Sequence, residues 1–414
     1  MKYFKLTLFL IFITQTILGQ SDESRFELSG YGEILFKHFD YGPNQRATEK
    51  GSTKENRSVI DIPRITFEAE YKFLNDLYLV SEIEFEHLGT GSALELEYEE
   101  FGEYEFESEK GGEVQIEELY LNKSFSNYFN IRAGRFPVPL ALFNKRHEPL
   151  DYFTTGFPEA HTSILPAEWN ETGLEIYGNL KMISYRLAVV NGLDASGFSS
   201  ERWIADGYQT KFEQISITNP AYVLNVDFEG INDLLAGGSF YIGNSAGNRP
   251  KPEDMNGIDA YVSIYNFHLF YSGNPFIFRG DFIYGNLENS GIVSQRNARL
   301  SVNTQNVRTP VAKNAMAWYA ETGYNIAAVF NIPVNYQLYP FIRYEYYNSM
   351  EKTEPGIFAN ERFKRNVITG GLNLVWNDEL ILKVDYSSRK VGNGKYNTEN
   401  SFGIAIGYNA TFIK

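Results

Sequence analysis

The last segment of this chain alternates between two kinds of residue with a period of two. Its apolar side chains fall on one face and its small or polar ones on the other, namely Phe402, Ile404, Ile406, Tyr408, Ala410 and Phe412 against Gly403, Ala405, Gly407, Asn409 and Thr411. A β-strand has this period, and a strand with one face in lipid and the other toward a watery interior needs this contrast. The same alternation recurs from Arg25 onward. It predicts an all-β fold, a transmembrane antiparallel β-barrel of the outer-membrane type.

About sixteen segments carry the pattern, an even number that is typical of bacterial barrels. The predicted strands are Arg25–Phe39, Val59–Phe73, Leu77–His87, Val114–Ser124, Phe129–Phe136, Thr172–Gly178, Ile183–Gly192, Ala221–Phe228, Leu234–Gly243, Gly257–Tyr271, Pro275–Gly285, Ala315–Asn325, Tyr336–Ser349, Lys364–Trp376, Leu380–Arg389 and Ser401–Ile413. Short turns and long loops alternate between them. This order predicts periplasmic turns at one end of the barrel and extracellular loops at the other. One or two helical turns are predicted in residues 201–214, where Gly207 interrupts the segment.

The first residues of the chain predict a secretory signal. Lys2 and Lys5 give a positive start, Leu6 to Leu18 form a short apolar run, and Gly19-Gln20 is a plausible cleavage point. The apolar run is shorter than the roughly 20 residues that a transmembrane helix needs. We therefore expect residues 1–20 to be removed and residues 21–414 to form one barrel domain in the outer membrane of a Gram-negative bacterium.

The composition excludes several classes of protein. The chain has no Cys, which excludes disulfides and thiolate metal sites. Its formal charge of −15 argues against nucleic acid as a partner, because binding phosphates requires a basic surface. Residues 95–113 hold nine Glu and one Lys but lack the Asp spacing of a calcium loop, which favours a solvated loop over a cation site. We predict no metal and no cofactor.

Because side chains alternate between the two faces of a strand, the residues between lipid-facing positions point into the barrel. Charged residues are expected at these inward positions, because Arg or Lys on the lipid face near the midplane costs about 2–4 kcal/mol. The predicted inward bases are Arg64, Arg132, Arg186, Arg279, Arg343 and Lys383. The predicted inward acids are Glu68, Glu70, Glu82, Glu84, Glu86, Glu175, Asp227, Asp259, Asp281, Glu321, Glu345 and Asp385. Acids outnumber bases, so the interior of the predicted pore should prefer cations weakly or not discriminate. Alternatively, many of these charges pair across neighbouring strands and serve only to solvate the interior.

The third long connection, residues 137–171, differs in composition from the other loops. It is rich in Pro and aromatic residues and poor in flexible Gly-Ser runs, which indicates an ordered loop. Such a loop needs a surface to pack on, and the barrel interior offers one. Folding inward would narrow the pore and place near the constriction Lys145, Arg146, His147, Glu148, Glu159, His161, Glu168 and Glu171. Arg146 is expected near the narrowest point, and the alternative is an extracellular cap.

Part of this region resembles a known family. The stretches IRAGRFPVPLALFN (Ile131–Asn144), HEP (His147–Pro149) and ILPAEWNETG (Ile164–Gly173) resemble the phosphate-selective porin O/P family of Bacteroidetes-type outer membranes. The resemblance implies a sixteen-stranded channel that assembles as a trimer. It also implies that phosphate is the transported solute. A phosphate channel needs clustered Lys and Arg side chains, whereas this loop offers Lys145 and Arg146 beside several acids. We therefore expect phosphate to bind poorly.

The sequence thus predicts a porin, a passive outer-membrane channel through which small hydrophilic solutes diffuse. The alternatives are a solute-specific channel for phosphate, other anions or oligosaccharides, and a closed structural or adhesive barrel. An enzyme is not expected, because His147, His161 and Ser163 share the third loop without the spacing of a nucleophile elbow. The expected partners are outer-membrane lipid and lipopolysaccharide, ions or small solutes, and two further copies of the chain in a homotrimer.

Overall fold

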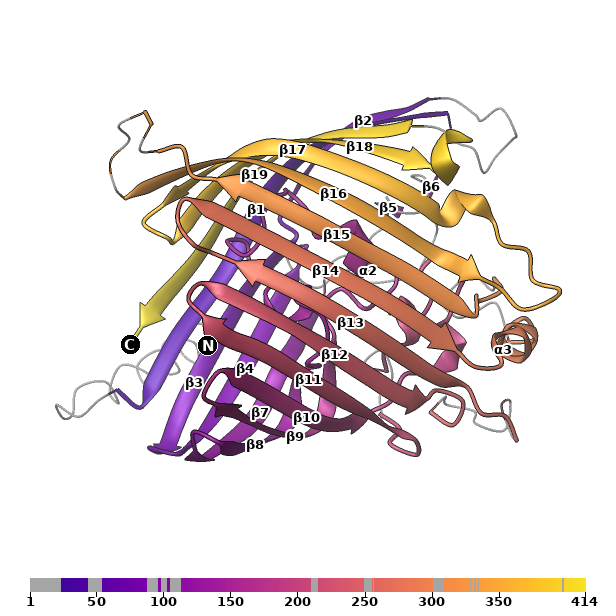
Figure 1. Cartoon of the computed structure of the whole chain (residues 1–414), viewed down its shortest axis with the longest axis horizontal. Helices are drawn as coiled ribbons and strands as arrows, with labels where there is room; N and C mark the ends of the chain where they lie inside the picture. Colours follow the sequence, from indigo (N-terminus) through magenta and orange to yellow (C-terminus); the bar gives the residue numbers. More distant parts are fainter. Residues whose placement is uncertain are drawn as a thin grey trace, which may run out of the picture.

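A computed structural model describes residues 24–43, 54–87, 96–97, 103–104, 113–209, 215–248, 255, 257–300, 309–327, 329–330, 333, 335–396 and 398–414. The strands of one large antiparallel sheet wind around a common axis (Figure 1). They are β1 (Phe26–Pro43), β2 (Lys54–Asp61), β3 (Arg64–Leu74), β4 (Leu77–Glu86), β7 (Val114–Ser126), β8 (Phe129–Pro137), β9 (Asn170–Leu180), β10 (Ile183–Asn191), β11 (Pro220–Ile231), β12 (Leu234–Asn244), β13 (Tyr261–Tyr271), β14 (Phe276–Leu287), β15 (Asn314–Tyr324), β16 (Tyr336–Lys352), β17 (Lys364–Trp376), β18 (Leu380–Val391) and β19 (Thr398–Ile413). A separate pair is formed by β5 (Leu96–Glu97) and β6 (Glu103–Tyr104).

The sheet closes on itself because β1 pairs with β19. β2 pairs with residues 35–43 of β1, and β3 pairs with residues 26–32 of the same strand. β2 and β3 therefore lie end to end and count as one stave, interrupted at Pro63, which has no N–H to donate to the ladder. The result is a closed barrel of sixteen antiparallel strands, and the predicted fold class is confirmed. The segment 59–73, predicted as one strand, is the stave that Pro63 divides.

The outer surface of the barrel shows the two-residue alternation directly. On β19, Ile406 is 54% exposed whereas its neighbour Ala405 is 1% exposed. Tyr344 and Arg343 on β16 differ in the same way, with the aromatic ring outside and the guanidinium inside. The alternation predicted for these strands is confirmed. No helix among the described residues is long and apolar enough to cross a membrane.

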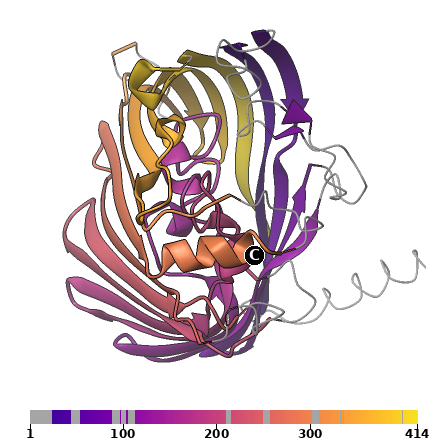
Figure 2. The same ribbon diagram turned by 90° about the vertical axis from the view of Figure 1, so that its right-hand side faces the viewer.

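Two short α-helices lie outside the strands, α2 (Glu159–Thr162) and α3 (Ser290–Asn297). Of the predicted helical segment 201–214, residues 210–214 lie outside the described residues, and the described part holds a 3-10 turn at Ala205–Gly207. Helix α3 was not predicted, because Val293 is the one apolar side chain that this helix buries and a single residue makes no periodic stripe. α3 lies at the end of the barrel that carries the long connections, which we call the long-loop end (Figure 2). The opposite end is the short-turn end.

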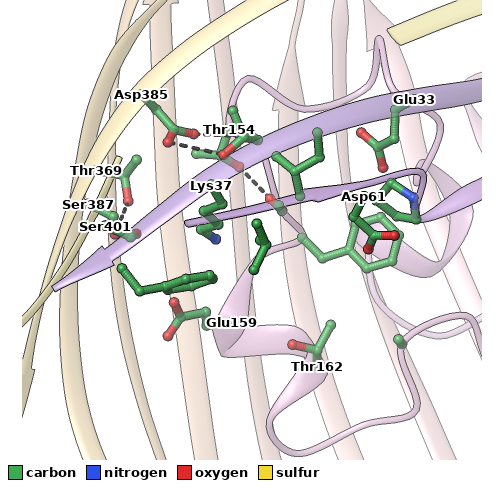
Figure 3. A pocket seen from close by; sticks show the side chains of 18 of the residues that line it. Glu33, Lys37, Asp61, Thr154, Glu159, Thr162, Thr369, Asp385, Ser387 and Ser401 are labelled. Carbon is green, nitrogen blue, oxygen red and sulfur yellow. Dashed lines mark hydrogen bonds between the residues drawn. The ribbon is translucent and has the colours of Figure 1, made fainter. Parts of the chain in front are cut away.

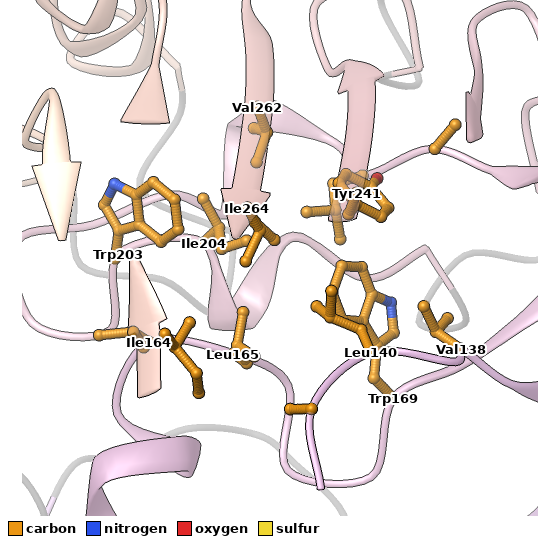
Figure 4. Packing of buried hydrophobic residues seen from close by; sticks show 14 of the residues in the cluster. Val138, Leu140, Ile164, Leu165, Trp169, Trp203, Ile204, Tyr241, Val262 and Ile264 are labelled. Carbon is orange, nitrogen blue, oxygen red and sulfur yellow. The ribbon is translucent and has the colours of Figure 1, made fainter. Parts of the chain in front are cut away.

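An apolar cluster fills much of one side of the barrel interior near the long-loop end (Figure 4). Trp203 and Ile204 come from the β10–β11 connection, Ile164 and Leu165 from the β8–β9 connection, and Val262 and Ile264 from the wall. Their side chains are essentially inaccessible to solvent. The expectation of a polar, watery interior is therefore wrong for this side of the barrel.

The inward-facing side chains of the strands explain why one part of the interior is apolar and another is polar. On β11 and β13 the inward side chains near the long-loop end are apolar, as Val223 and Val262 show. Toward the short-turn end the same faces carry Asp227 and His268. Loops that fold inward can bury their apolar side chains only against apolar partners. They therefore pack on the apolar wall positions near the long-loop end, and the wall positions near the short-turn end stay polar.

Candidate functional site

The β8–β9 connection, residues 138–169, lies inside the barrel, and we call it the inward loop (Figure 2). Carboxylates that project from three strands hold its backbone. The Leu142 amide donates to Asp281 at 2.9 Å, and the Ala160 amide donates to Glu345 at 2.9 Å. The Phe153 amide donates to Glu321 at 3.3 Å. These three acids, which the alternation along their strands predicted to face inward, therefore accept hydrogen bonds from the loop. Hydrogen bonds to a charged group are stronger than those between neutral groups.

Arg64 ties the inward loop to the opposite wall. Its guanidinium, at the start of β3, makes an ion pair with Glu168 and donates to the backbone oxygen of His147. It also lies over the ring of Phe157, 4.6 Å from the centroid, and over Tyr31 at 4.9 Å. Cation–π contacts of this kind strengthen when they are shielded from water. Arg64 thus joins β1, β3 and three separate positions of the loop at one point.

A second tie fixes the loop near the long-loop end. Glu159 of α2 accepts from Arg389 of β18 at 2.6 and 2.8 Å and from the Tyr347 hydroxyl at 2.6 Å. Burial raises the pKa of Glu159, but the Arg389 guanidinium and these hydrogen bonds outweigh it and lower the pKa to about 2. Glu159 therefore stays ionised at neutral pH. Arg389 also pairs with Glu399 at 2.7 Å.

A cavity of about 420 Å³ remains between the inward loop and the strands β1–β4 and β16–β19 (Figure 3). Its lining combines charged and hydroxyl-bearing side chains with apolar ones such as Leu35, Val59 and Phe157. Glu33, Lys37, Asp61, Thr154, Glu159, Thr162, Thr369, Asp385, Ser387 and Ser401 surround it in this view. Of the residues expected at a constriction, the cavity gathers Arg64, Glu159, Glu168, Arg343 and Glu345.

Other expected residues lie elsewhere in the interior. Lys145 pairs with Asp227 at 2.9 Å on the wall beneath the apolar cluster. Arg146 lies over Phe270, 4.4 Å from the ring centroid, and Glu148 accepts from Asn409 near the short-turn end. These three residues do not line the cavity.

Two of the expected arginines share one carboxylate near the short-turn end. Arg132 and Arg186 lie 3.5 and 3.7 Å from Glu175, and Arg132 stacks on Tyr120. Glu171 is enclosed, because its carboxylate accepts from the indole of Trp169 at 2.9 Å and from Asn191. It is therefore a structural acceptor behind the loop and not part of the cavity wall.

The remaining expected bases also have protein partners. Arg279 and Arg343 both pair with Glu321, at 2.8 and 3.6 Å. The Lys383 ammonium donates to the Thr154 oxygen at 3.1 Å and lies 3.6 Å from the Tyr152 ring centroid. Asp259, predicted to point inward, is exposed beyond the start of β13. The sequence placed it on a strand that begins two residues later.

The two histidines of the inward loop serve packing. His147 is 3.3 Å from the Tyr31 hydroxyl, and the ring of His161 lies 5.0 Å from that of Phe143. Burial lowers the pKa of His147 to about 4 and that of His161 to about 3, so both rings are neutral at pH 7. Across the described ranges no group of three or more His, Asp or Glu residues is arranged to hold a metal ion.

Basic residues of the interior that were missed from the sequence include three on strands. Lys37 and Arg389 line the cavity, and Arg365 pairs with Glu201 at 3.7 Å. The alternation of inward and outward positions along each strand could have identified all three as facing inward. Lys37 shares its face with Glu33, and Arg389 shares its face with Asp385.

Comparisons with other proteins support the fold. The chain is 27% identical over 363 residues to an uncharacterised protein of Aquifex aeolicus, with 87% of this chain and 74% of that protein covered. No protein-family model matches the chain.

Among solved structures, the barrel is similar to a loop L8 deletion mutant of OmpT, an outer membrane protein of Vibrio cholerae. The TM-score is 0.51 at 11% identity, covering 94% of this chain and 100% of that one. It is also similar to the outer membrane channel DcaP of Acinetobacter baumannii, with a TM-score of 0.50 at 12% identity, covering 95% and 99%. Identities this low show the fold alone. The chain is thus a closed β-barrel of the outer-membrane type.

Proposed function

We propose that this protein is a passive outer-membrane channel for small hydrophilic solutes. The observation that supports this best is the cavity with its many charged and hydroxyl-bearing side chains, which lies inside a closed barrel with an apolar outer surface. A barrel that served only as a scaffold would have no need of a cavity lined by hydroxyls and charges beside a packed apolar half. The similarity to the channel DcaP agrees with this function at the level of the fold.

Acidic side chains are concentrated on one wall of the proposed path. Glu68, Glu82 and Glu118 occupy neighbouring positions across β3, β4 and β7. Arg365 and Arg389 face inward from β17 and β18, where Arg365 pairs with Glu201 and Arg389 pairs with Glu159 and Glu399. The acidic cluster would therefore dominate the field that a solute meets.

The arginines of the interior limit what the channel can select. Arg64, Arg279, Arg343 and Arg389 each pair with a carboxylate of the protein. A paired guanidinium offers little to phosphate, which needs several free donors. We therefore retain the resemblance to the phosphate-selective porin O/P family as support for a channel, and propose weak cation preference or none in place of phosphate selectivity.

We further propose that the protein is not an enzyme and that three copies form a homotrimer in the membrane, in contact with lipid and lipopolysaccharide. His147 and His161 are buried and neutral, which leaves them poorly suited to act as a base on a solute. Chemical cross-linking in outer-membrane vesicles would test the trimer, with a band at three times the monomer mass as the expected result.

Conductance across a planar bilayer tests the channel. We expect discrete steps in KCl and a small reversal potential of the cation-preferring sign. A barrel with no continuous path gives no steps and would refute the proposal.

Cysteine labelling tests the path itself, because the chain has no natural Cys. Ser401 lines the cavity, whereas its neighbour Phe402 faces outward with 37% exposure. A water-soluble cationic thiol reagent should lower the conductance of Ser401→Cys and leave that of Phe402→Cys unchanged. Equal responses would mean that the current does not pass the cavity.

A further inference from the structure

A second cavity lies beside the first, and we call it the acidic chamber. It has a volume of about 210 Å³ and shares with the larger cavity a wall that includes Glu84, Glu86 and Glu168. Residues of β4, β7, β8, β9, the inward loop and the β10–β11 connection enclose it. Its acidic lining residues are Glu84, Glu86, Glu113, Glu117, Glu168 and Asp206, and its basic ones are Arg135 and Arg202. Acids therefore outnumber bases in the lining.

The arginines at the acidic chamber are already paired with acids of its lining. Each of them neutralises a carboxylate of the protein, so the remaining acids receive no positive charge from them. The pairs are Arg135 with Glu117 at 3.2 Å, Arg202 with Asp206 at 2.9 Å, and Arg64 with Glu168 and, at 4.0 Å, with Glu84. Two acids of the lining, Glu86 and Glu113, are left over. Among the described residues, no basic side chain lies within 4.0 Å of either carboxylate.

Glu86 and Glu113 lie directly opposite each other at the wall of the acidic chamber. The Glu86 amide donates to the Glu113 carbonyl oxygen at 2.9 Å, and their chain neighbours Phe85 and Val114 are register partners on β4 and β7. Directly opposite residues of an antiparallel pair project to the same face, and both of these side chains line the chamber. Like charges in this arrangement destabilise the pair. A cation held between the two carboxylates would remove this repulsion.

An unpaired acceptor in another part of the lining also favours a ligand that donates hydrogen bonds. Asn170, at the start of β9, is 6% exposed and lines the acidic chamber. Its Nδ2 atom donates to Glu117 at 2.7 Å, which fixes the orientation of the amide because a carboxylate accepts and does not donate. Its Oδ1 atom is buried and has no hydrogen-bond partner within the described chain. Burying such an acceptor is costly, and an N–H group of a ligand would satisfy it.

The spread of these groups favours an extended organic cation over a metal ion. In the part of the chain that the structure describes, no three His, Asp or Glu side chains are arranged to hold a metal ion. Glu113 and Glu117 are four residues apart along one strand, which corresponds to roughly 13 Å of backbone. The lining also has apolar side chains, Phe157 and Pro166 among them, on which methylene groups can pack. A methylene chain with an ammonium group at each end matches both features.

We propose that the acidic chamber is a binding subsite for an aliphatic diammonium ion, a cation of the polyamine class. One ammonium group lies between Glu86 and Glu113, and the other donates to Asn170 beside Glu117. The methylene chain packs on the apolar side chains of the inward loop. The subsite rests on the proposed channel function, since it would hold the solute on its way through, and it assigns that solute a positive charge.

Titration calorimetry with the aliphatic diamine cadaverine on the purified barrel at neutral pH tests the subsite. Glu86→Gln and Glu113→Gln each remove one charge and keep the size of the side chain, and relief of a like-charge contact should not unfold the barrel. Loss of one charge-assisted contact should weaken cadaverine binding by about tenfold in each variant. Glu288→Gln is the matched control, because Glu288 is exposed beyond the end of β14 and lines neither cavity. Its binding should stay within about twofold of the wild type.

Two comparison ligands test the class of cation. Pentylamine has the same carbon chain with one ammonium group, and Mg²⁺ has two charges without the chain. Both should bind at least about tenfold more weakly than cadaverine. Mg²⁺ that binds as tightly as cadaverine, or chamber variants that bind cadaverine normally, would overturn the proposal. A wild-type barrel that does not bind cadaverine would also overturn it, because protons or dissolved salt would then balance the carboxylates.

The channel and the subsite fail in distinguishable ways. Conductance in KCl alone reports the channel, whereas the calorimetric signal reports the subsite. A protein that conducts but does not bind cadaverine refutes the subsite only. One that binds cadaverine through Glu86 and Glu113 but never conducts supports the subsite and refutes the channel.

Discussion

The tie between Glu159 and Arg389 makes a quantitative prediction about stability. The pKa of Glu159 falls from its usual 4.5 to about 2, and its side chain is 25% exposed. At about 1.36 kcal/mol per pKa unit, ionised Glu159 contributes on the order of 3 kcal/mol to folding at neutral pH. Glu159→Gln should therefore lower the free energy of unfolding by about that amount at pH 7, since the amide keeps hydrogen-bonding capacity but loses the charge.

The sign of the pH dependence follows from the lowered pKa. The contribution is fully present above the pKa of the unfolded chain, about 4.5, and is lost as the pH falls toward the folded value of about 2. The difference between wild type and Glu159→Gln should be constant from pH 7 to about 5 and then shrink on acidification.

Urea unfolding in detergent micelles or lipid vesicles, followed by the fluorescence of buried Trp169 and Trp203, measures this difference. Glu361→Gln is the matched control. Glu361 pairs with Lys395 at the same 2.6 Å distance, but its side chain is 49% exposed. A surface pair contributes about 0–1 kcal/mol, so this variant should change little. Equal effects of the two substitutions, or a Glu159 effect that grows on acidification, would refute the reasoning.

Three further predictions concern export, topology and selectivity. The protein isolated from the outer membrane should begin near Gln20 or Ser21, as N-terminal sequencing would show, whereas a mature chain that starts at Met1 would contradict the signal. Epitope tags inserted in the connections 88–113 and 286–314 should be accessible to antibody on intact cells and tags at Asn75 or Asp378 should not, since long loops face outward in such barrels. Arg146→Glu should shift the reversal potential toward cations without unfolding the protein, because the Arg146 side chain is 41% exposed and its pair with Asp151 spans 3.6 Å. An unchanged reversal potential would show that the current does not pass this residue.

The sequence determined the barrel because the relevant information is local. A period of two along each strand and short turns between alternate strands are properties of neighbouring residues. Parity alone turned Arg64, Arg343 and Glu345 inward, and the structure places them there. The same rule would have found Lys37 and Arg389 had it been applied to every strand.

The pairing of the interior charges could not be read from the sequence, because it depends on contacts between distant segments. Glu159 and Arg389 are 230 positions apart, and Leu142 meets Asp281 across 139. The path of the inward loop decides which charges meet.

The division of the interior also belongs to the tertiary structure. In the sequence, inward apolar residues of the strands such as Val223 and Val262 cannot be told from other inward positions. The apolar residues of the loops likewise carry no sign of the partners that they pack against. Only the folded chain brings them into one cluster, because burying apolar surface on both partners removes it from water. The cavity beside the inward loop occupies the space that this packing leaves.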